Sequence, residues 1–249
     1  MKRYKVDLHI HSCLSPCGSL DMDPESIVET ALRKGLDAIA ITDHNSTLQC
    51  PVIQELGQER GLLVLAGVEV TTSEEVHCLV LFKDEKSRKE FQAYLDQHLP
   101  PIPNDPDYLG DQVWVNARNE IQGEVAYSLL SAIDQSLEQV ESKCAEVDGL
   151  FIAAHIDRPS FSVISQLGFI SPQRRFDAIE YSNYQRFSQL IKQQRYLSKY
   201  IAYSASDAHQ IDQIGEKYAI LESEELSFNA IRNIFKNKDK QFIYSHLNG

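Results

Sequence analysis

The sequence has no hydrophobic stretch of the length that a membrane-spanning helix requires. Such a helix takes about 20 consecutive apolar residues, and no run within the 249 residues approaches that length. The first residues, MKRYK, lead into a short strand-like run that carries Asp7 and two histidines, where a signal peptide would place an uninterrupted apolar core. The sequence therefore predicts a cytoplasmic protein without a membrane partner.

Cysteines are few and odd in number. The five cysteines (13, 17, 50, 78 and 144) are scattered through a chain that is long enough to form a core without disulfides. The segment CLSPC at 13–17 has neither the spacing of a redox dithiol nor that of a zinc-finger pair. These observations favour reduced thiols and exclude a disulfide-stapled fold.

Basic residues are also sparse. The 24 lysines and arginines are outnumbered by 36 aspartates and glutamates, which gives a formal net charge of −12. No dense Lys/Arg run provides the basic stripe that binding to a nucleic acid duplex generally needs, so a long nucleic acid is not an expected partner. The sequence also lacks a Gly-rich phosphate-binding loop and the Gly-x-Ser-x-Gly turn of a serine hydrolase, which argues against those two classes.

A short apolar run, a polar tip and then a helical pattern recur along the chain. The apolar runs predict strands over residues 6–10, 36–41, 62–70, 76–82, 150–154, 176–181 and 200–205, with a further short strand at 218–221. Helices are predicted from Asp23 as N-cap to Gly35 as stop, and over 86–98, 124–147, 188–198 and 228–235. About seven buried strands alternating with helices indicate one α/β domain with a mainly parallel sheet, either closed into a barrel or open.

Residues 99–123 interrupt this alternation. Prolines 100, 101 and 103 prevent a helix, and the single tryptophan, Trp114, follows them. A structureless loop of this length is uncommon unless it has a function. We expect either a lid or rim over the functional site, or a surface excursion in which Trp114 is a packing anchor.

Polar residues gather at the ends of the predicted strands. The strand tips carry His9-Ile10-His11, Thr42-Asp43-His44, Glu69, His155 and Ser206-Asp207-Ala208-His209. In parallel α/β folds the functional residues collect at the carboxyl ends of the strands, so these side chains should lie close together. Five of the eight histidines lie at these tips, whereas His77 opens the fourth apolar run.

The spacing and chemistry of these residues predict metal binding. His9 and His11, like Asp207 and His209, are two residues apart and would point to the same side of a strand. Any one histidine could simply be buried and hydrogen-bonded, but so many titratable groups at adjacent strand ends would be costly without cations. Imidazole and carboxylate ligands suit zinc, iron or manganese better than calcium. Two such ions, bridged by a carboxylate such as Glu69, could clamp a phosphoryl group.

The order of these motifs resembles the PHP (polymerase and histidinol phosphatase) superfamily. The resemblance covers nearly the whole chain and rests on His9-x-His11, Thr42-Asp43-His44, Glu69, His77, His155 and Asp207-x-His209. It implies a distorted (β/α)7 TIM-like barrel, with one PHP domain over residues 1–249. It also implies two or three divalent ions (zinc, manganese or iron) at the C-terminal end of the barrel.

The resemblance divides the metal ligands into three sets. The ligands would be His9, His11, Glu69 and Asp207 for the first ion, Glu69, His77 and His155 for the second, and His44 and His209 for the third. Where family members typically have an Asp or His shortly after the His-x-His pair, this sequence has Cys17. A thiolate there could complete the third site, and the alternative is a weak or absent third ion.

Further polar residues have expected roles around the ions. Asp7 and Asp43 are expected to orient imidazoles, with proton transfer as the alternative for Asp43. Arg158 stands three residues after His155, where related phosphoesterases carry a phosphate-contacting arginine, and its planar fork suits phosphate. The alternative for Arg158 is a surface salt bridge. Arg174 and Arg175 are candidates for contacts at the rim of the site.

Together these features predict a hydrolase of phosphoric ester bonds in which Glu69, Asp43 and Arg158 serve catalysis. A hydroxide bridging the ions would attack a small phosphorylated substrate, such as an amino alcohol phosphate or a nucleotide. The alternatives are a nuclease acting on short oligonucleotides and a non-catalytic, regulatory metal-binding PHP module. The sequence does not indicate an oligomeric state.

Overall fold

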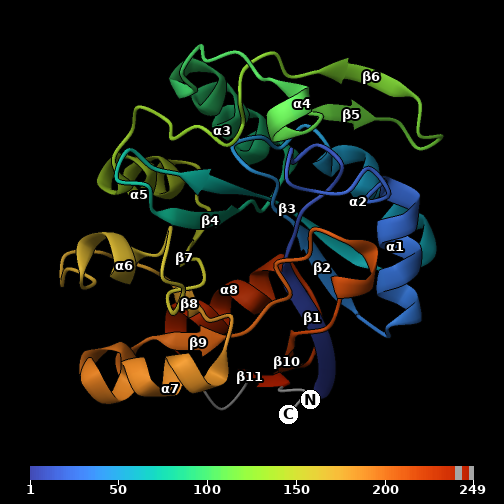
Figure 1. The fold of residues 1–249 in the computed structure, drawn as a ribbon. Helices are drawn as coiled ribbons and strands as arrows, with labels where there is room; N and C mark the ends of the chain where they lie inside the picture. Colours follow the sequence, from blue (N-terminus) through green and yellow to red (C-terminus); the bar gives the residue numbers. More distant parts are fainter. Residues whose placement is uncertain (239–242, 247–249) are drawn as a thin grey trace.

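The computed structural model describes residues 1–238 and 243–246 (Figure 1). Its main element is a nine-stranded sheet with the strand order β11-β10-β1-β2-β3-β4-β7-β8-β9. These strands are β1 (Lys2–Ile10), β2 (Ala38–Ile41), β3 (Leu63–Thr71), β4 (His77–Leu81), β7 (Leu150–Ala153), β8 (Ala178–Glu180), β9 (Ile201–Tyr203), β10 (Tyr218–Ser223) and β11 (Ile243–His246).

Apart from the last helix, which packs against the other face of the strands, the helices lie around the sheet on its outer side (Figure 1). They are α1 (Pro24–Arg33), α2 (Cys50–Arg60), α3 (Glu85–His98), α4 (Pro106–Leu109), α5 (Leu137–Glu146), α6 (Val163–Leu167), α7 (Tyr184–Gln193) and α8 (Phe228–Asn237), with 3-10 turns η1 (Arg195–Lys199) and η2 (Ile211–Gln213). Among these described helices, none combines the length and the apolar character needed to cross a membrane.

Seven of the strands, β1 to β4 and β7 to β9, form a nearly closed barrel, which confirms the predicted distorted (β/α)7 fold. Backbone hydrogen bonds connect the two ends of this array. Asp207 N donates to His9 O at 2.9 Å, and His11 N donates to Ala208 O at 3.0 Å. The barrel therefore closes at the level where β1 and β9 end, and this closure brings the first and last predicted ligand pairs together.

Strand β4 runs against its neighbours, which corrects the expectation of a mainly parallel sheet. It pairs antiparallel with both β3 and β7, whereas β1-β2, β2-β3, β7-β8 and β8-β9 pair in parallel. The reason is the short connection from β3 to β4, where Thr72 N donates to Val76 O at 3.0 Å. A turn of this length can join only antiparallel strands, since a parallel crossover needs a dozen or more residues. The start of β4 therefore lies beside the carboxyl ends of β3 and β7.

The buried apolar side chains form two clusters on the two faces of the strands. One cluster takes residues from all seven barrel strands, such as Leu8, Ala40 and Leu79, together with one face of α8. The other takes alternate strand residues, such as Ile39 and Val64, with the buried faces of the surrounding helices. Burial of both faces explains why the strands read as nearly continuous apolar runs.

Several helices differ from the sequence prediction. Helix α1 follows it, because Asp23 caps the helix by accepting from the backbone N–H groups of Glu25 and Ser26. Helix α2 was not predicted. Helix α7 begins at Tyr184, earlier than expected, and the chain after it continues as η1.

The long helix predicted over 124–147 is wrong for its first half. Helix α5 begins only at Leu137, after Ser136, whose side chain and that of Gln139 form a capping box. The preceding residues are held by Gln112, whose side chain donates to the carbonyls of Val125 and Tyr127 and accepts from Leu129 N. A contact from a distant residue thus replaces the local helical hydrogen bonds.

Residues 99–123 contain α4 and most of a two-stranded hairpin, β5 (Val113–Val115) and β6 (Ile121–Glu124). Gln49 fixes this hairpin, because its side chain accepts from Val115 N at 2.9 Å and donates to Val115 O at 3.0 Å. Gly110 lies so close to Pro16 that a Cβ at this position would be 2.0 Å from the Pro16 carbonyl oxygen. The segment thus packs against the loop that follows β1, and its role as a lid stays a prediction.

Candidate metal centre

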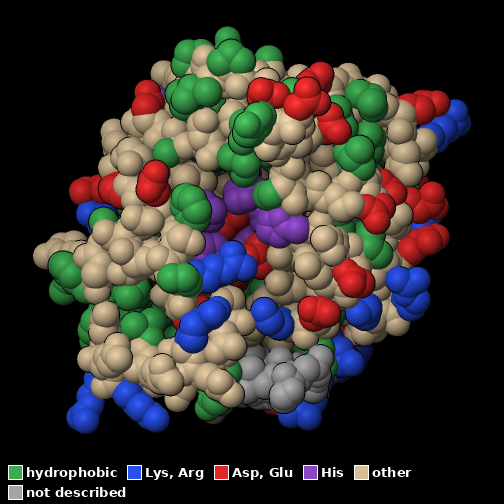
Figure 2. All heavy atoms as spheres, in the orientation of Figure 1, with side chains coloured by type: hydrophobic (Ala, Val, Ile, Leu, Met, Phe, Trp, Pro, Cys, Tyr) green, Lys and Arg blue, Asp and Glu red, His purple; other side chains and the backbone are tan. Residues whose placement is uncertain are grey.

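The predicted metal ligands gather at one end of the barrel. Figure 2 shows histidine side chains inside a hollow in one face of the molecule, with acidic side chains among them and Lys or Arg side chains along the lower edge. His9 lies in β1 and Glu69 in β3, and His77 opens the antiparallel β4. His155 and Asp207 follow β7 and β9. Reversal of β4 is what puts His77 at the same end as the others.

The first group of ligand atoms comes from His9, His11, Glu69 and Asp207, and all four residues are buried. The Nε2 atoms of the two imidazoles are 3.2 Å apart. Each lies 3.3 Å from Asp207 Oδ1, and they lie 3.5 and 3.3 Å from Glu69 Oε2. Ligands at ~2.0–2.1 Å from a tetrahedral ion would be separated by roughly 3.3–3.4 Å. The group therefore has the dimensions of a metal site.

A second set of ligand atoms faces the other oxygen of Glu69. His77 Nδ1 and His155 Nε2 each lie 3.0 Å from Glu69 Oε1. On the other oxygen, Oε2, His44 Nδ1 joins the first group at 3.3 Å. Glu69 is 1% exposed, so its two oxygens are available only to these neighbours. The carboxylate thus lies between two sets of imidazoles, as a bridging ligand would.

The third group consists of His11, His44 and His209. The rings of His11 and His209 stack with centroids 4.1 Å apart, and His209 Nδ1 donates to Asp207 O at 2.9 Å. Cys17 is exposed and belongs to none of the groups whose atoms lie within 4.8 Å of one another. Its thiol is partly desolvated and lies near the negative charge of Glu69, and these effects raise its pKa to about 12. The predicted thiolate ligand is thus not in ligand contact in this structure.

The acids of the cluster are held in their charged forms. Burial alone would raise the pKa of Glu69, but the imidazoles of His77, His9 and His44 lower it well below its ordinary value. Burial alone would also raise the pKa of Asp207, but the charge of His9 lowers this pKa below its ordinary value. Both residues therefore present ionised oxygens at neutral pH.

The imidazoles fall into two electrostatic classes. Burial would lower the pKa of His9, but Glu180 and the other nearby carboxylates raise it well above its ordinary value. Burial also opposes protonation of His11, whose contacts with carboxylates nevertheless raise its pKa to about 9. By contrast, burial lowers the pKa of His44 well below its ordinary value and that of His209 to about 4. The second pair is therefore neutral at pH 7 and ready to ligate.

Outer hydrogen bonds orient the first two imidazoles. His9 Nδ1 donates to the two carboxylate oxygens of Glu180 at 3.1 and 3.0 Å. His11 Nδ1 donates to Ser15 Oγ at 2.9 Å, and this hydroxyl donates to Asp43 Oδ1 at 2.7 Å. These bonds leave the Nε2 atom of each ring to face the cluster.

Asp43 and Asp7 lie outside the ligand groups. Asp43 also accepts from the N–H and the hydroxyl of Ser12, at 2.6 and 2.7 Å, so that both of its oxygens are engaged. Its contact with the cluster runs through Ser15, which favours the orienting role over proton transfer. Asp7 accepts from the N–H groups of Ser206 and Gly215, and burial raises its pKa to about 6. Asp7 thus positions the backbone before Asp207, not an imidazole.

Glu180 was missed by the sequence analysis. It is the last residue of β8 and is 1% exposed. The signal was present, because an acid at the carboxyl end of an apolar buried strand is the same pattern that identified Glu69. Its role differs, since it contacts the outer nitrogen of His9 and is not part of a ligand group.

Two candidate ligands have unusual backbone conformations. His155 and Asp207 have φ values of 28° and 54°, in the left-handed region that non-glycine residues rarely adopt. Such conformations cost on the order of 1–3 kcal/mol each and concentrate at functional sites, where the surrounding structure holds them. Both residues come just after a short barrel strand. Their left-handed backbone conformation turns their side chains toward the cluster.

The loop after β7 places Arg158 and Phe161 beside the cluster. The guanidinium of Arg158 forms an ion pair with Asp207, and the side chain remains 38% exposed. Phe161 stacks on His77 with ring centroids 4.7 Å apart, and its carbonyl accepts from His77 N at 2.8 Å. Arg158 is therefore at the cluster, where a phosphate contact is feasible. Arg174 is not, because it pairs with Glu138 and Glu141; it and Arg175 line a separate cavity.

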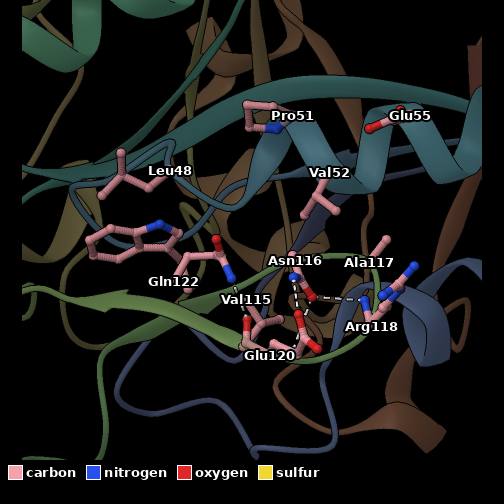
Figure 3. A pocket seen from close by; sticks show the side chains of 11 residues that line it. Leu48, Pro51, Val52, Glu55, Val115, Asn116, Ala117, Arg118, Glu120 and Gln122 are labelled. Carbon is pink, nitrogen blue, oxygen red and sulfur yellow. Dashed lines mark hydrogen bonds between the residues drawn. The ribbon is translucent and has the colours of Figure 1, made fainter.

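A cavity of about 480 Å³ lies away from the cluster, between α2 and the β5-β6 hairpin (Figure 3). Trp114 lines it, so this tryptophan belongs to the hairpin cavity. Among the polar lining groups, Asn116 donates to Glu120 at 2.7 Å and accepts from Arg118 N at 2.9 Å. No candidate ligand lines this cavity. The histidine cluster is therefore the candidate functional site.

The residues of the cluster fit divalent metal ions. Within the described part of the chain, the Nδ1 atoms of His44 and His77 are buried without a hydrogen-bond partner, and both face Glu69. An unsatisfied buried polar atom costs about 1–3 kcal/mol, and a cation shared by these imidazoles and Glu69 would remove that cost. The mixture of imidazole and carboxylate suits zinc, manganese or iron.

Comparison with known proteins agrees with this description. A family model for the PHP domain matches residues 7–238. An uncharacterized protein of Methanocaldococcus jannaschii is 35% identical over 128 residues, which cover 44% of this chain and 75% of that protein. A phosphoribosyl 1,2-cyclic phosphate 1,2-diphosphodiesterase of Eggerthella lenta is 34% identical over 84 residues, which cover 32% of this chain and 31% of that enzyme.

Solved structures share the fold at low identity. The lesion-specific endonuclease Q of Pyrococcus furiosus superposes with a TM-score of 0.70 and 20% identity, over 95% of this chain and 56% of that one. An amidohydrolase of Chromobacterium violaceum, solved with bound sulfate and no metal, gives a TM-score of 0.56 and 19% identity, over 98% of both chains. This chain thus spans about half of endonuclease Q and about a third of the diphosphodiesterase.

Proposed function

Since this chain belongs to the PHP domain family, we propose that it is a metal-dependent hydrolase of phosphoester bonds with a small phosphorylated substrate. The observation that carries the proposal is the position of Glu69, whose two oxygens face two different sets of ligand atoms. A carboxylate shared in this way is what a two-metal site for phosphoryl chemistry requires.

The ligands of the proposed ions follow from the three groups. They are His9, His11, Glu69 and Asp207 for the first ion, Glu69, His77 and His155 for the second, and His44 and His209 for the third, with Cys17 as the further candidate that the sequence suggests. Bound zinc, manganese or iron would supply a water of lowered pKa and Lewis-acid stabilisation of the phosphoryl oxygens.

The protein's own side chains position these groups and bind the substrate. Glu180 and Ser15 keep the Nε2 atoms of His9 and His11 turned to the cluster, and Asp43 holds Ser15 in place. Arg158 contacts Asp207 from the open side and is partly exposed. Its guanidinium can therefore donate hydrogen bonds to two phosphoryl oxygens at once and stabilise the negative charge that develops on them.

The proposal of a small substrate rests on charge. An overall charge of −12 repels a long polyanion. Because endonuclease Q shares this fold, a short oligonucleotide is nonetheless included in the test below.

Phosphate release by the metal-loaded protein tests the function. Protein freed of metal with a chelator and reloaded with manganese, zinc or iron(II) should release phosphate from sugar phosphates, nucleotides or a 5′-phosphorylated dinucleotide. Glu69→Gln, loaded in the same way, should release none. If stoichiometrically loaded wild-type protein hydrolyses no phosphate ester, the enzyme proposal is wrong and a regulatory metal-binding module takes its place.

A further inference from the structure

Another cavity, of about 270 Å³, lies next to the histidine cluster on the side of Arg158. It is formed by the loop after β7, the first turn of α6 and one face of α7. Its lining residues are Ile156, Asp157, Arg158, Pro159, Ile164, Ser165, Arg186, Gln189, Leu190 and Gln193. The function proposed above assigns a role only to Arg158 among them.

The charged groups of this cavity leave a net excess of donors. The side chain of Asp157 is fully buried, and its carboxylate already accepts from Ser182 N, the Ser182 hydroxyl, Asn183 N and Arg186 Nε. Arg186 uses Nε for Asp157 and Nη2 for Ser182, which leaves Nη1 without a partner among the described residues. The one acid is therefore saturated, whereas Arg186 is 52% exposed and retains a free donor.

Helix α7 adds neutral donors on the same face. Arg186, Gln189 and Gln193 are spaced at i, i+3 and i+7, which places their side chains in one row along the helix. Neither glutamine side chain has a hydrogen bond to the part of the chain that the structure describes, and both line the cavity. A row of one guanidinium and two amides is suited to an anion with several acceptor oxygens.

Arg158 lies between this cavity and the cluster. Its guanidinium contacts Asp207, a candidate ligand of the first ion, and the same residue lines the cavity wall. An anion bound by Arg186 and a phosphoryl group at the cluster would therefore lie on the two sides of Arg158, where one molecule can carry both.

We propose that this cavity is a subsite for a second phosphate group of the substrate, held by Arg186, Gln189 and Gln193. The inference rests on the proposed phosphoesterase function and names its substrate class, which is an ester that carries a further phosphate beyond the one hydrolysed. A cavity of about 270 Å³ accommodates one phosphate and its linker. The second phosphate can belong to a small bisphosphate or to the next nucleotide of a short strand, since both present the same oxygens.

Two substrate pairs test the subsite and separate its sources. The first pair is glucose 6-phosphate and glucose 1,6-bisphosphate, and the second is a nucleoside 5′-monophosphate and a 5′-phosphorylated dinucleotide. The manganese-loaded wild type should favour the doubly phosphorylated member of at least one pair in kcat/KM. Arg186→Gln should reduce that preference on the order of tenfold or more, which corresponds to one charged hydrogen bond. Gln189→Ala should reduce it less, and Arg118→Gln, in the distant hairpin, should retain the wild-type ratio.

Direct binding separates failure of the subsite from failure of the function. Inorganic pyrophosphate, titrated by calorimetry into metal-loaded protein, should bind Arg186→Gln about tenfold more weakly than wild type or Arg118→Gln. If no ester is hydrolysed but this difference is found, the subsite stands and the phosphoesterase function falls. Wild-type protein that prefers the doubly phosphorylated member of neither pair, or an Arg186→Gln variant with unchanged preference and unchanged pyrophosphate binding, overturns the subsite. Asp157 keeps three other donors in the variant, so a melting temperature near that of wild type is expected.

Discussion

The first and third ligand groups share His11 and lie side by side, but they are built differently. The first combines two imidazoles with the carboxylates of Glu69 and Asp207, and all four residues are buried. The third has three imidazoles and no carboxylate, and the side chain of His209 is 26% exposed. His11 thus belongs both to an enclosed group with two carboxylates and to a more open group that contains imidazoles alone.

This difference indicates which of the proposed ions the protein binds most tightly. A dication gains most from ionised carboxylates in a site that excludes water, because Coulomb attraction is strongest there. The first group offers two such carboxylates, with outer hydrogen bonds that fix its imidazoles. The third adds only the neutral imidazoles of His44 and His209 to His11. We therefore expect the first ion to bind tightly and the third to bind weakly, and the following predictions challenge that ranking.

Glu69→Gln should have the largest effect. The substitution removes the charge that both sets of imidazoles face, while it keeps the shape of the side chain. Metal stoichiometry should fall by at least one ion, and turnover should fall by more than the ~100-fold typical of losing an outer contact. Elemental analysis and phosphate release measure the two effects. Glu75→Gln, an exposed residue in the β3-β4 turn, is the matched control, and near-normal turnover in Glu69→Gln would refute the bridging role.

Glu180→Gln should have the next largest effect, confined to the first ion. The neutral amide cannot stabilise the positive charge that His9 acquires when it binds the ion. The affinity for this ion should therefore drop by roughly 10–100-fold. A competition titration with a chromophoric chelator measures this for the first and later equivalents separately. Equal weakening of all equivalents would instead indicate a general loss of structure, which the melting temperature of the metal-free variant would reveal.

The strand tips were predictable from the sequence because a barrel brings the carboxyl ends of its parallel strands to one rim. His9, His44, Glu69 and Asp207 follow that rule. His77 does not, since the apolar pattern shows where β4 lies but not its direction. Only the resemblance to known proteins identified it in the sequence, and the short β3-β4 turn supplies the physical reason for its position.

Features that depend on distant contacts were not predictable. Residues 125–136 look helical locally, but the side chain of Gln112 holds their first part in an irregular path. Helix α2 was missed because Gly57, packed against Val64, interrupts its apolar pattern. Glu180 could have been found as a strand-end acid, but nothing in the sequence states that it pairs with His9.

The number of protons released on metal binding should distinguish the first group from the third. We expect this difference to be smaller than the effect of Glu180→Gln and larger than that of Cys17→Ser. In the metal-free protein His9 has a pKa well above its ordinary value and His11 one of about 9, so both hold protons at pH 7 and must lose them to ligate. His44 and His209, with lowered pKa values, are already neutral. The first equivalent of zinc should therefore release protons, and its affinity should rise with pH above 7.

Calorimetric titrations at pH 7 in two buffers of different ionisation enthalpy give the number of protons released by each equivalent. Later equivalents, bound mainly by neutral imidazoles, should release few. If the first and last equivalents release equal numbers, the electrostatic distinction between the groups is wrong. Repetition at pH 9.5 is the internal control, because release from His11, whose pKa is about 9, should then be smaller.

Cys17→Ser should have the smallest effect, and it decides the composition of the third group. In the structure this group contains His11, His44 and His209, while Cys17 lies outside it with a thiol whose raised pKa disfavours the thiolate. The serine variant should therefore bind its weakest ion within about threefold of wild type, a change well below one full ligand. His209→Ala should lose that ion and keep the first, since His209 contributes to the third group alone.

A loss in Cys17→Ser as large as that in His209→Ala would mean that the loop after β1 moves to bring the thiolate to the ion, as the sequence suggested. The third group would then carry a negative ligand, and the expected difference in affinity between the two groups would shrink accordingly.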